Sequence, residues 1–210
     1  MHCPFNNKNC KKKNQKIFLD LGKLPRVDVL LSKQDLKKKE TTKPLKIYFC
    51  KKCFLVQHPA YTDPKDIFVD DYIYYSSTVS SWVEHCQEFV NQSIKRFSLS
   101  QKSFVIEVAS NDGYLLQNFV KKNIPCLGVE PSTGVIKEAK KKGVKTINDF
   151  YNLVSSKKII KSYPRADLII ANNVLAHIPN LKDFIESSLL LLKEDGVITV
   201  EVPHLLNLIK

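Results

Sequence analysis

The chain has 210 residues, of which 43% are hydrophobic and 26% charged, the composition of an ordinary soluble globular protein. Its length allows one well-cored domain with a small accessory module, and no run approaches the roughly 18 to 20 apolar residues that span a bilayer. The first residues lack the apolar core of a secretory signal, so we expect a cytoplasmic protein without membrane association.

The formal net charge of +12 would attract polyanions. Only Arg26, Arg96 and Arg165 are arginines, however, and all other basic residues are lysines. Arginine is the preferred residue for bidentate recognition of bases and phosphates. The lysine runs therefore indicate solvated faces rather than a surface that reads nucleic acid.

Residues 1–60 contain strand-like segments at 17–21 and 45–49 and two cysteine pairs. Cys50 and Cys53 have the C-x2-C spacing of a zinc knuckle, in which one tight turn presents two thiolates to a tetrahedral metal. Cys3 and Cys10 form a looser second pair, and His2 or His58 could replace one of these thiolates. A small zinc-binding module is predicted. Cys86 and Cys126 lie in apolar periodic contexts and are predicted to be core residues.

Residues 61–100 contain a connector rich in tyrosine and aspartate, followed by apolar residues at helical spacing from Val79 to Phe97. The spacing predicts an amphipathic helix of about five turns that packs on the next domain. For Trp82 and His85 on this helix, packing is favoured over contact with a substrate.

Residues 101–210 alternate between strand and helix patterns. The predicted strands are 104–109, 126–130, 144–147, 166–172 and 196–202, with helices between them. Repeated β-α-β units with short links predict an α/β fold whose parallel sheet is doubly wound.

The first of these strands leads into a turn, IEVASNDGYLLQNF at 106–119, that has a single glycine. Phosphate-binding turns need several glycines, and Asp112 would place a negative charge beside a pyrophosphate, so NAD and ATP are disfavoured. A nucleoside without phosphates fits better. Glu107 could accept from an ammonium or hydroxyl group, and Glu130, which ends the second strand, could accept from both ribose hydroxyls.

The fourth strand ends in Asn172 and Asn173, with His177 about one helical turn later. These residues place polar groups where a methyl donor would meet its acceptor. From spacing alone, a structural role for His177 is favoured over a catalytic one.

The strings EVASNDGYLL, LGVEP, DLIIANNVLAHIPNL and GVITVEVPHLL resemble the S-adenosylmethionine-dependent sugar C-methyltransferases, which methylate carbon 3 of nucleotide-linked 4-keto-deoxysugars. The resemblance extends upstream through DYIYYSSTVSSWVEH to the cysteine pairs. It implies a zinc module followed by a Rossmann-like class I methyltransferase core, with a nucleotide-sugar as substrate.

The resemblance also implies roles for individual residues, in two sets. The first set would hold the cofactors. Structural zinc would be bound by Cys3, Cys10, Cys50 and Cys53. The methionine and ribose of the donor would be bordered by Glu107, Ala109, Ser110, Asn111, Asp112, Gly113 and Glu130, its adenine by Pro131 and Phe150, and its methyl end by Asn172 and Asn173. Those that would face the sugar are Tyr72, Asn173 and His177, with Tyr72 and His177 as the catalytic pair that holds an enolate oxygen or relays a proton.

The sequence departs from the family pattern in two respects, which concern the zinc site and the activity of the chain. The first cysteine pair is usually C-x2-C, whereas Cys3 and Cys10 have six residues between them. The family also continues for about as many residues again, through a Tyr-His-Glu-His segment that carries the proposed base and a second α/β domain that grips the nucleotide-sugar. We therefore expect an incomplete sheet and an amino-terminal half that binds the donor but is inactive alone, with a separate polypeptide able to supply the rest.

Two other functions compete with this one. A zinc-containing nucleic-acid-binding module on a Rossmann-like scaffold is the alternative that the net charge and cysteine pairs favour. An NAD-dependent sugar oxidoreductase is disfavoured by the glycine-poor turn and by Asp112.

Overall fold

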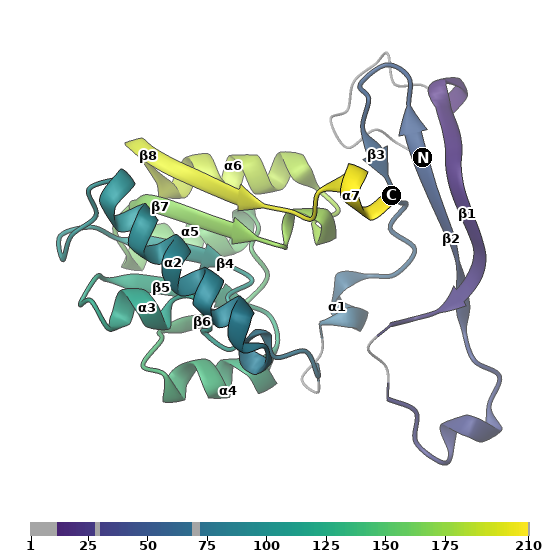
Figure 1. The fold of residues 1–210 in the computed structure, drawn as a ribbon, viewed down its shortest axis with the longest axis horizontal. Helices are drawn as coiled ribbons and strands as arrows, with labels where there is room; N and C mark the ends of the chain where they lie inside the picture. The colour runs from purple at the N-terminus through teal and green to yellow at the C-terminus, as the bar shows by residue number, and fades with distance from the viewer. Residues whose placement is uncertain (1–11, 28–29, 69–71, 210) are drawn as a thin grey trace. The chain divides into compact units, whose positions relative to one another are not determined.

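A computed structural model describes residues 12–27, 30–68 and 72–209 of the chain (Figure 1). The chain divides into two compact units, residues 1–67 and 68–210. Among the described residues, no helix is both long enough and apolar enough to cross a membrane.

The first unit is built on an antiparallel sheet with the strand order β1-β2-β3. Its elements are η1 (Lys12–Asn14), β1 (Gln15–Pro25), η2 (Asp35–Lys37), β2 (Thr42–Cys50), β3 (Val56–Gln57) and α1 (Pro64–Ile67). The two predicted strands are confirmed, since they lie within β1 and β2. Most side chains of β1 are exposed, and Cys50 is the one fully buried hydrophobic residue among those described in this unit. A segment with so small a core needs another source of stability.

The second unit contains a five-stranded parallel sheet in the order β6-β5-β4-β7-β8. The strands are β4 (Val105–Val108), β5 (Cys126–Glu130), β6 (Thr146–Asn148), β7 (Ala166–Asn172) and β8 (Leu192–Glu201). All five predicted strands and their parallel arrangement are confirmed, β5 and β7 with the predicted limits. The chain order reverses between β4 and β7, which makes the carboxyl ends of these strands the expected position for a ligand.

Helices cover both faces of this sheet (Figure 1). The helices of this unit are η3 (Ser76–Thr78), α2 (Ser80–Arg96), α3 (Gln117–Val120), α4 (Thr133–Lys141), α5 (Leu153–Ser162), η4 (Leu175–His177), α6 (Leu181–Leu191) and α7 (Leu205–Ile209), of which α7 has no buried residue. One core cluster joins α2, α3 and α4 to side chains such as Val105 and Leu168, and the other joins α5 and α6 to Ile106 and Ile169. Neighbouring residues of a strand thus face opposite sides of the sheet, which explains the apolar runs at residues 104–106 and 168–171.

The predicted amphipathic helix is confirmed as α2. Cys86 and Val90 on its inner face are fully buried, and Trp82 packs against the same cluster with partial exposure. The predicted core position of Cys86 is therefore correct, and Cys126 packs against the cluster while partly exposed.

Candidate functional site: a buried polar cluster at the carboxyl ends of the strands

The turn that follows β4 is held in a tight backbone conformation. Ala109, Asn111 and Gly113 have φ angles of 54°, 48° and 74°, in the left-handed region. The amide of Ala109 donates to the carbonyl of Val129 over 2.8 Å, which ties the turn to β5. The helix expected directly after the turn is only one turn long, because the chain first makes this sequence of left-handed residues.

The single glycine of the turn serves helix packing. A Cβ atom at Gly113 would lie 3.0 Å from Cγ2 of Val144 and 3.2 Å from the backbone and Cβ of Ala139. Glycine is therefore needed where α4 and the strand after it approach the turn. No further glycine is required, because Asn111 reaches the left-handed region at small cost.

The side chain of Asn111 is used to fix the segment that precedes α2. Its Oδ1 accepts from the amide of Ser76 over 2.9 Å, and its Nδ2 donates to the carbonyl of Tyr74 over 3.0 Å. The Asn111 side chain is therefore occupied by protein groups.

One oxygen of the Asp112 carboxylate, Oδ2, is also occupied by protein groups, whereas Oδ1 has no hydrogen-bond partner among the described residues. Oδ2 accepts from the hydroxyl of Ser77 and forms an ion pair with Nζ of Lys142 at 3.0 Å, while only 1% of the Asp112 side chain is exposed. Lys142 offsets the negative charge of Asp112, which weakens the charge argument against a phosphate at this turn. No local pattern indicated this partner, because a lysine in a lysine run is usually solvated.

Glu130 ends β5 beside the turn and is 3% exposed. Its Oε2 accepts from the amide of Asn111 over 3.0 Å, and its Oε1 accepts from the amide of Ser132 over 2.9 Å. Burial raises the pKa of Glu130, and the bonds from Ser132 and Asn111 lower it in part. Two lone-pair positions of the carboxylate are thus taken, and others are available to a pair of hydroxyl groups.

Buried polar atoms without partners converge on the same edge. Glu107 is 1% exposed and Asn172 is 5% exposed, and among the described residues neither carboxylate oxygen of Glu107 and neither amide atom of Asn172 has a hydrogen-bond partner. In the β4–β7 register Glu107 lies opposite Ile170, so Asn172 is two residues further along the neighbouring strand and on the same face. The buried hydroxyl of Ser110 in the turn is likewise unpaired.

These unpaired polar groups destabilise the folded chain unless a ligand supplies hydrogen-bond partners for them. Each buried polar group left without a partner costs about 1 to 3 kcal/mol. Burial raises the pKa of Glu107 well above its ordinary value, the nearby Tyr114 hydroxyl lowers it in part, and the charges of Glu130 and Asp112 raise it further. A ligand that brings an ammonium group and hydroxyl groups would satisfy the acids, so the residues present fit the amino-acid and ribose parts of S-adenosylmethionine.

Two predicted adenine contacts lie at the same edge, beyond β5 and β6. Pro131 directly follows Glu130, and its carbonyl accepts from Nδ2 of Asn148 over 2.7 Å. Phe150 follows β6 by two residues, and both predicted contacts are half-buried.

The ring of Phe68 lies against both predicted catalytic residues. Its centroid is 5.4 Å from the ring of Tyr72 and 6.2 Å from that of His177, edge-on in both cases. The structure therefore brings Tyr72 and His177 together around Phe68, which the sequence pattern did not single out.

Asn173 follows β7 with a φ angle of 53° and is held by Glu201 at the end of β8. Its amide donates to the Glu201 carbonyl over 2.7 Å, and its Nδ2 donates to Oε1 of Glu201 over 3.1 Å. The other carboxylate oxygen of Glu201 lies 2.8 Å from Nε2 of His85. Glu201 was not predicted as a site residue, because an acid at the end of an exposed edge strand has no distinguishing local spacing.

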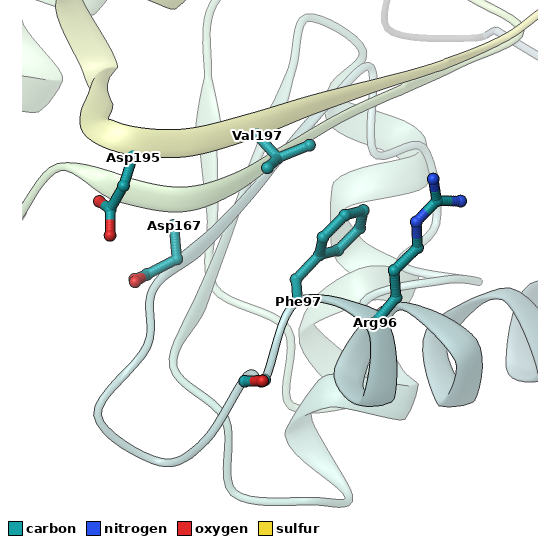
Figure 2. Close-up of a pocket in the computed structure, with 6 residues that line it drawn as sticks. Arg96, Phe97, Asp167, Asp195 and Val197 are labelled. Carbon is teal, nitrogen blue, oxygen red and sulfur yellow. The ribbon is translucent and has the colours of Figure 1, made fainter.

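A separate hollow of about 270 Å³ lies elsewhere on the second unit. Figure 2 shows its lining by Arg96, Phe97, Asp167, Asp195 and Val197, which come from the end of α2, the start of β7 and the first half of β8. Asp167 already accepts from Nζ of Lys193 at 2.7 Å and from the amide of Phe104 at 2.7 Å. This hollow is therefore distinct from the polar cluster at the carboxyl ends.

In the first unit, Cys50 and Cys53 lie on one tight turn between β2 and β3. The amide of Cys50 donates to the carbonyl of Leu55 over 3.0 Å, and the amide of Phe54 donates to the carbonyl of Cys50 over 2.9 Å. This geometry fits a zinc knuckle. Cys3, Cys10 and His2 lie outside the described residues, and within the part of the chain that is described no three His, Cys, Asp or Glu side chains gather as metal ligands.

Two family models match the chain. One described as "Putative zinc binding domain" matches residues 8–68, and one described as "Methyltransferase domain" matches residues 82–208. A curated relative, "C-methyltransferase NovU" of Streptomyces niveus, is 29% identical over 192 residues, which are 91% of this chain and 46% of the relative. The chain thus spans less than half the length of that relative.

Two solved structures with partial similarity are the following. An S-adenosylmethionine-dependent methyltransferase from Clostridium acetobutylicum is 20% identical, with 59% of this chain and 51% of that chain covered and a TM-score of 0.46. Streptomyces venezuelae DesVI is 18% identical, with 66% and 57% covered and a TM-score of 0.45. Likenesses of this size add nothing to the assignment of function.

The first prediction concerns the buried ion pair of the turn. Lys142→Met should lower the free energy of unfolding by about 3 kcal/mol, because it leaves the buried Asp112 carboxylate without its counter-charge. Urea denaturation measures the change. Lys141→Met is the matched control: Lys141 pairs with Glu138 at 2.7 Å, but the side chains are 71% and 40% exposed, so the cost should stay below about 1 kcal/mol. Equal costs for the two variants would contradict the role assigned to Lys142.

The second prediction concerns pH. Since burial raises the pKa of Glu107, the folded chain keeps the Glu107 proton to higher pH than the unfolded chain does, and its stability falls as pH rises through that raised pKa. Glu107→Gln stays neutral, so it should stabilise the ligand-free chain by about 1 to 3 kcal/mol at pH 8 and by less at pH 4.5. Denaturation at the two pH values measures this. Glu138→Gln, at an α4 side chain that is 40% exposed, should leave the pH difference unchanged. A Glu107→Gln variant that behaves identically to this control would refute the prediction.

The third prediction concerns the metal. The purified chain should contain about one zinc ion, and Cys53→Ser should lose most of it because a knuckle with one thiolate holds zinc poorly. Elemental analysis after dialysis measures the content. Cys126→Ala, in the second unit, should leave the zinc content unchanged. Zinc retained in full by Cys53→Ser would exclude the knuckle as the metal site.

Proposed function

The chain belongs to the methyltransferase-domain family, whose model covers residues 82–208, and on that premise we propose that it is the donor-binding part of an S-adenosylmethionine-dependent C-methyltransferase that acts on a nucleotide-linked 4-keto-deoxysugar. The observation that carries the proposal is the cluster of Glu107 and Asn172, buried without partners at the switch point of the sheet beside Glu130. This edge is where a doubly wound sheet binds its ligand.

The donor supplies, when bound, an electrophilic methyl group on a positively charged sulfur. Glu107 would accept from its ammonium group, and the negative charge that is costly in the empty cluster would then be balanced. Glu130 would accept from the ribose hydroxyls with the lone pairs that its two backbone bonds leave free. The backbone of Ala109 to Gly113 would border the methionine and ribose, Pro131 and Phe150 the adenine, and Asn172 and Asn173 the methyl end.

On the acceptor side, Tyr72, Asn173 and His177 would face the sugar. Removal of a proton next to the ketone gives an enolate whose carbon then takes the methyl group. The Tyr72 hydroxyl and the His177 imidazole suit the developing charge on the enolate oxygen, since donors aimed at that oxygen stabilise the transition state. The rings of both residues lie against Phe68.

The relative that is named as a C-methyltransferase is covered over only 46% of its length, so we assign the grip on the nucleotide-sugar to residues outside these 210, on a separate polypeptide or a longer chain. The 210-residue chain should bind the donor but should not transfer its methyl group when it is alone.

The alternative is a zinc-containing nucleic-acid-binding module, which the net charge of +12 favours. It predicts an RNA affinity that falls steeply with salt, whereas donor binding by the polar cluster depends on salt only weakly. RNA binding with a steep salt dependence and no donor binding would favour this alternative.

The fourth prediction tests donor binding. Titration calorimetry of the purified chain should detect S-adenosylhomocysteine binding, and Glu130→Ala should weaken it about tenfold or more, because charge-assisted bonds to the ribose are worth about 1.5 to 3 kcal/mol. The matched control is Glu138→Ala on the exposed side of α4, which should bind as the unsubstituted chain does. Absence of binding by the unsubstituted chain would refute the proposed function.

A further inference from the structure

The segment between Tyr72 and α2 is held by the turn that follows β4. We call residues 74–78 of this segment the strap, and it contains η3. The amide of Ser76 in the strap donates to Oδ1 of Asn111 over 2.9 Å, and Nδ2 of Asn111 donates to the Tyr74 carbonyl over 3.0 Å. One side chain of the turn thus binds both a donor and an acceptor of the strap backbone.

The next residue of the turn makes a second attachment. Oδ2 of Asp112 accepts from the Ser77 amide over 3.3 Å and also from the Ser77 hydroxyl. Asp112 is 1% exposed, and Asn111 and Ser76 are 7% and 9% exposed. Water therefore competes little for these bonds, which makes them stronger than hydrogen bonds at the surface.

Apolar packing contributes less to the position of the strap. Tyr74 is 55% exposed, and the flanking Ile73 and Val79 are 42% and 56% exposed. Segments with few buried apolar contacts open more easily than the core of a domain. The hydrogen bonds to Asn111 and Asp112 therefore decide whether the strap stays on the turn.

The same turn is bonded to the acid proposed for the ribose. Oε2 of Glu130 accepts from the backbone amide of Asn111 over 3.0 Å. Burial raises the pKa of Glu130, and hydroxyl groups that donate to this carboxylate act in the opposite direction because they favour its ionised form. An ionised acceptor forms the stronger bond to an amide, so a bound ribose would hold the backbone of Asn111 more firmly. These contacts connect Glu130 to the strap.

We propose that Asn111 and Asp112 are positioning residues, whose side chains couple donor binding at Glu130 to the order of the strap and thereby to the position of Tyr72; this rests on the proposed function. Tyr72 precedes the strap by two residues, and its ring lies against Phe68. A strap that is fixed on the turn restricts the backbone next to Tyr72. The two side chains thus act on the acceptor side through the strap and without touching the sugar.

Amide hydrogen exchange tests the coupling. The 210-residue chain is placed in D₂O with and without saturating S-adenosylhomocysteine, and the peptide that carries the Ser76 and Ser77 amides is followed by mass spectrometry. Its exchange should slow about tenfold when the ligand is bound, which lies in the usual range of coupling between two sites. Peptides of β1, in the other unit, should exchange equally in both conditions. An unchanged exchange rate at Ser76 and Ser77 would overturn the inference.

Asn111→Gly measures the same coupling from the other side. Glycine adopts the left-handed conformation of this position freely, but it removes both side-chain bonds to the strap. Coupling is reciprocal, so the affinity for S-adenosylhomocysteine should fall by about the factor by which the ligand slows exchange, roughly tenfold. An affinity equal to that of the unsubstituted chain would contradict the coupling.

Variants at Ser77 separate positioning from a merely structural role, because the residues proposed for the donor do not include Ser77. Ser77→Ala should weaken S-adenosylhomocysteine binding about threefold and reduce the protection that the ligand gives to the strap. Ser77→Thr keeps the hydroxyl and should behave as the unsubstituted chain does. Ser80→Ala, at an exposed serine of α2, is the matched control and should change neither quantity. Equal results for Ser77→Ala and Ser80→Ala would count against the inference.

Ligand binding separates failure of the inference from failure of the proposed function. If S-adenosylhomocysteine binds to the unsubstituted chain and the strap exchanges independently of it, only the inference is overturned. If S-adenosylhomocysteine does not bind, the proposed function is overturned and the inference with it.

Discussion

The second unit is organised around the burial of carboxyl groups at the carboxyl ends of its strands. Glu107, Asp112 and Glu130 are each 3% exposed or less, and like charges so close to one another raise the free energy of the folded chain. The surrounding chain compensates two of them. Lys142 forms an ion pair with Asp112 and the Ser77 hydroxyl donates to it, while the backbone amides of Asn111 and Ser132 donate to Glu130.

Glu107 is the carboxyl group that the protein leaves uncompensated, apart from the nearby Tyr114 hydroxyl. A buried acid without a dedicated partner reduces stability, so its presence at the switch point is better explained by a ligand than by folding. The same reasoning applies to the buried amide of Asn172 on the neighbouring strand. The position of the uncompensated groups, rather than their number, therefore marks where the donor's amino group would lie.

The glycine-poor turn is explained by the contacts that its residues make. Left-handed backbone at Ala109 and Asn111 carries a cost of about 1 kcal/mol for a residue with a Cβ atom. Asn111 offsets it with two side-chain bonds to the segment before α2. Glycine is needed at position 113 because α4 approaches the turn there too closely for a Cβ atom. The turn is thus a rigid support for the adjacent acids, built without the bare backbone that phosphate recognition requires.

Sequence periodicity predicted the parts of the fold that depend on local patterns. β5 and β7 have continuous apolar runs bounded by polar residues, and α2 has a long apolar stripe, so period and length identified all three. A helix was predicted after the turn, but its length was not: α3 is only one turn long because the chain first passes through left-handed residues that the helical pattern does not reveal. Lys142 and Glu201 were missed for another reason: their partners, Asp112 and Asn173, are distant in sequence, and only the folded sheet brings them together.

The division of the chain into two units separates the two cofactors. Every residue assigned to the donor lies between Glu107 and Asn173, within the unit 68–210, which has two large apolar clusters of its own. The unit 1–67 has Cys50 as its one fully buried hydrophobic residue among those described, so a metal held by thiolates would supply the stability that its core does not. A metal held by these thiolates would stabilise its own unit, whereas the unit that contains the residues proposed for the donor is held together by its own apolar clusters.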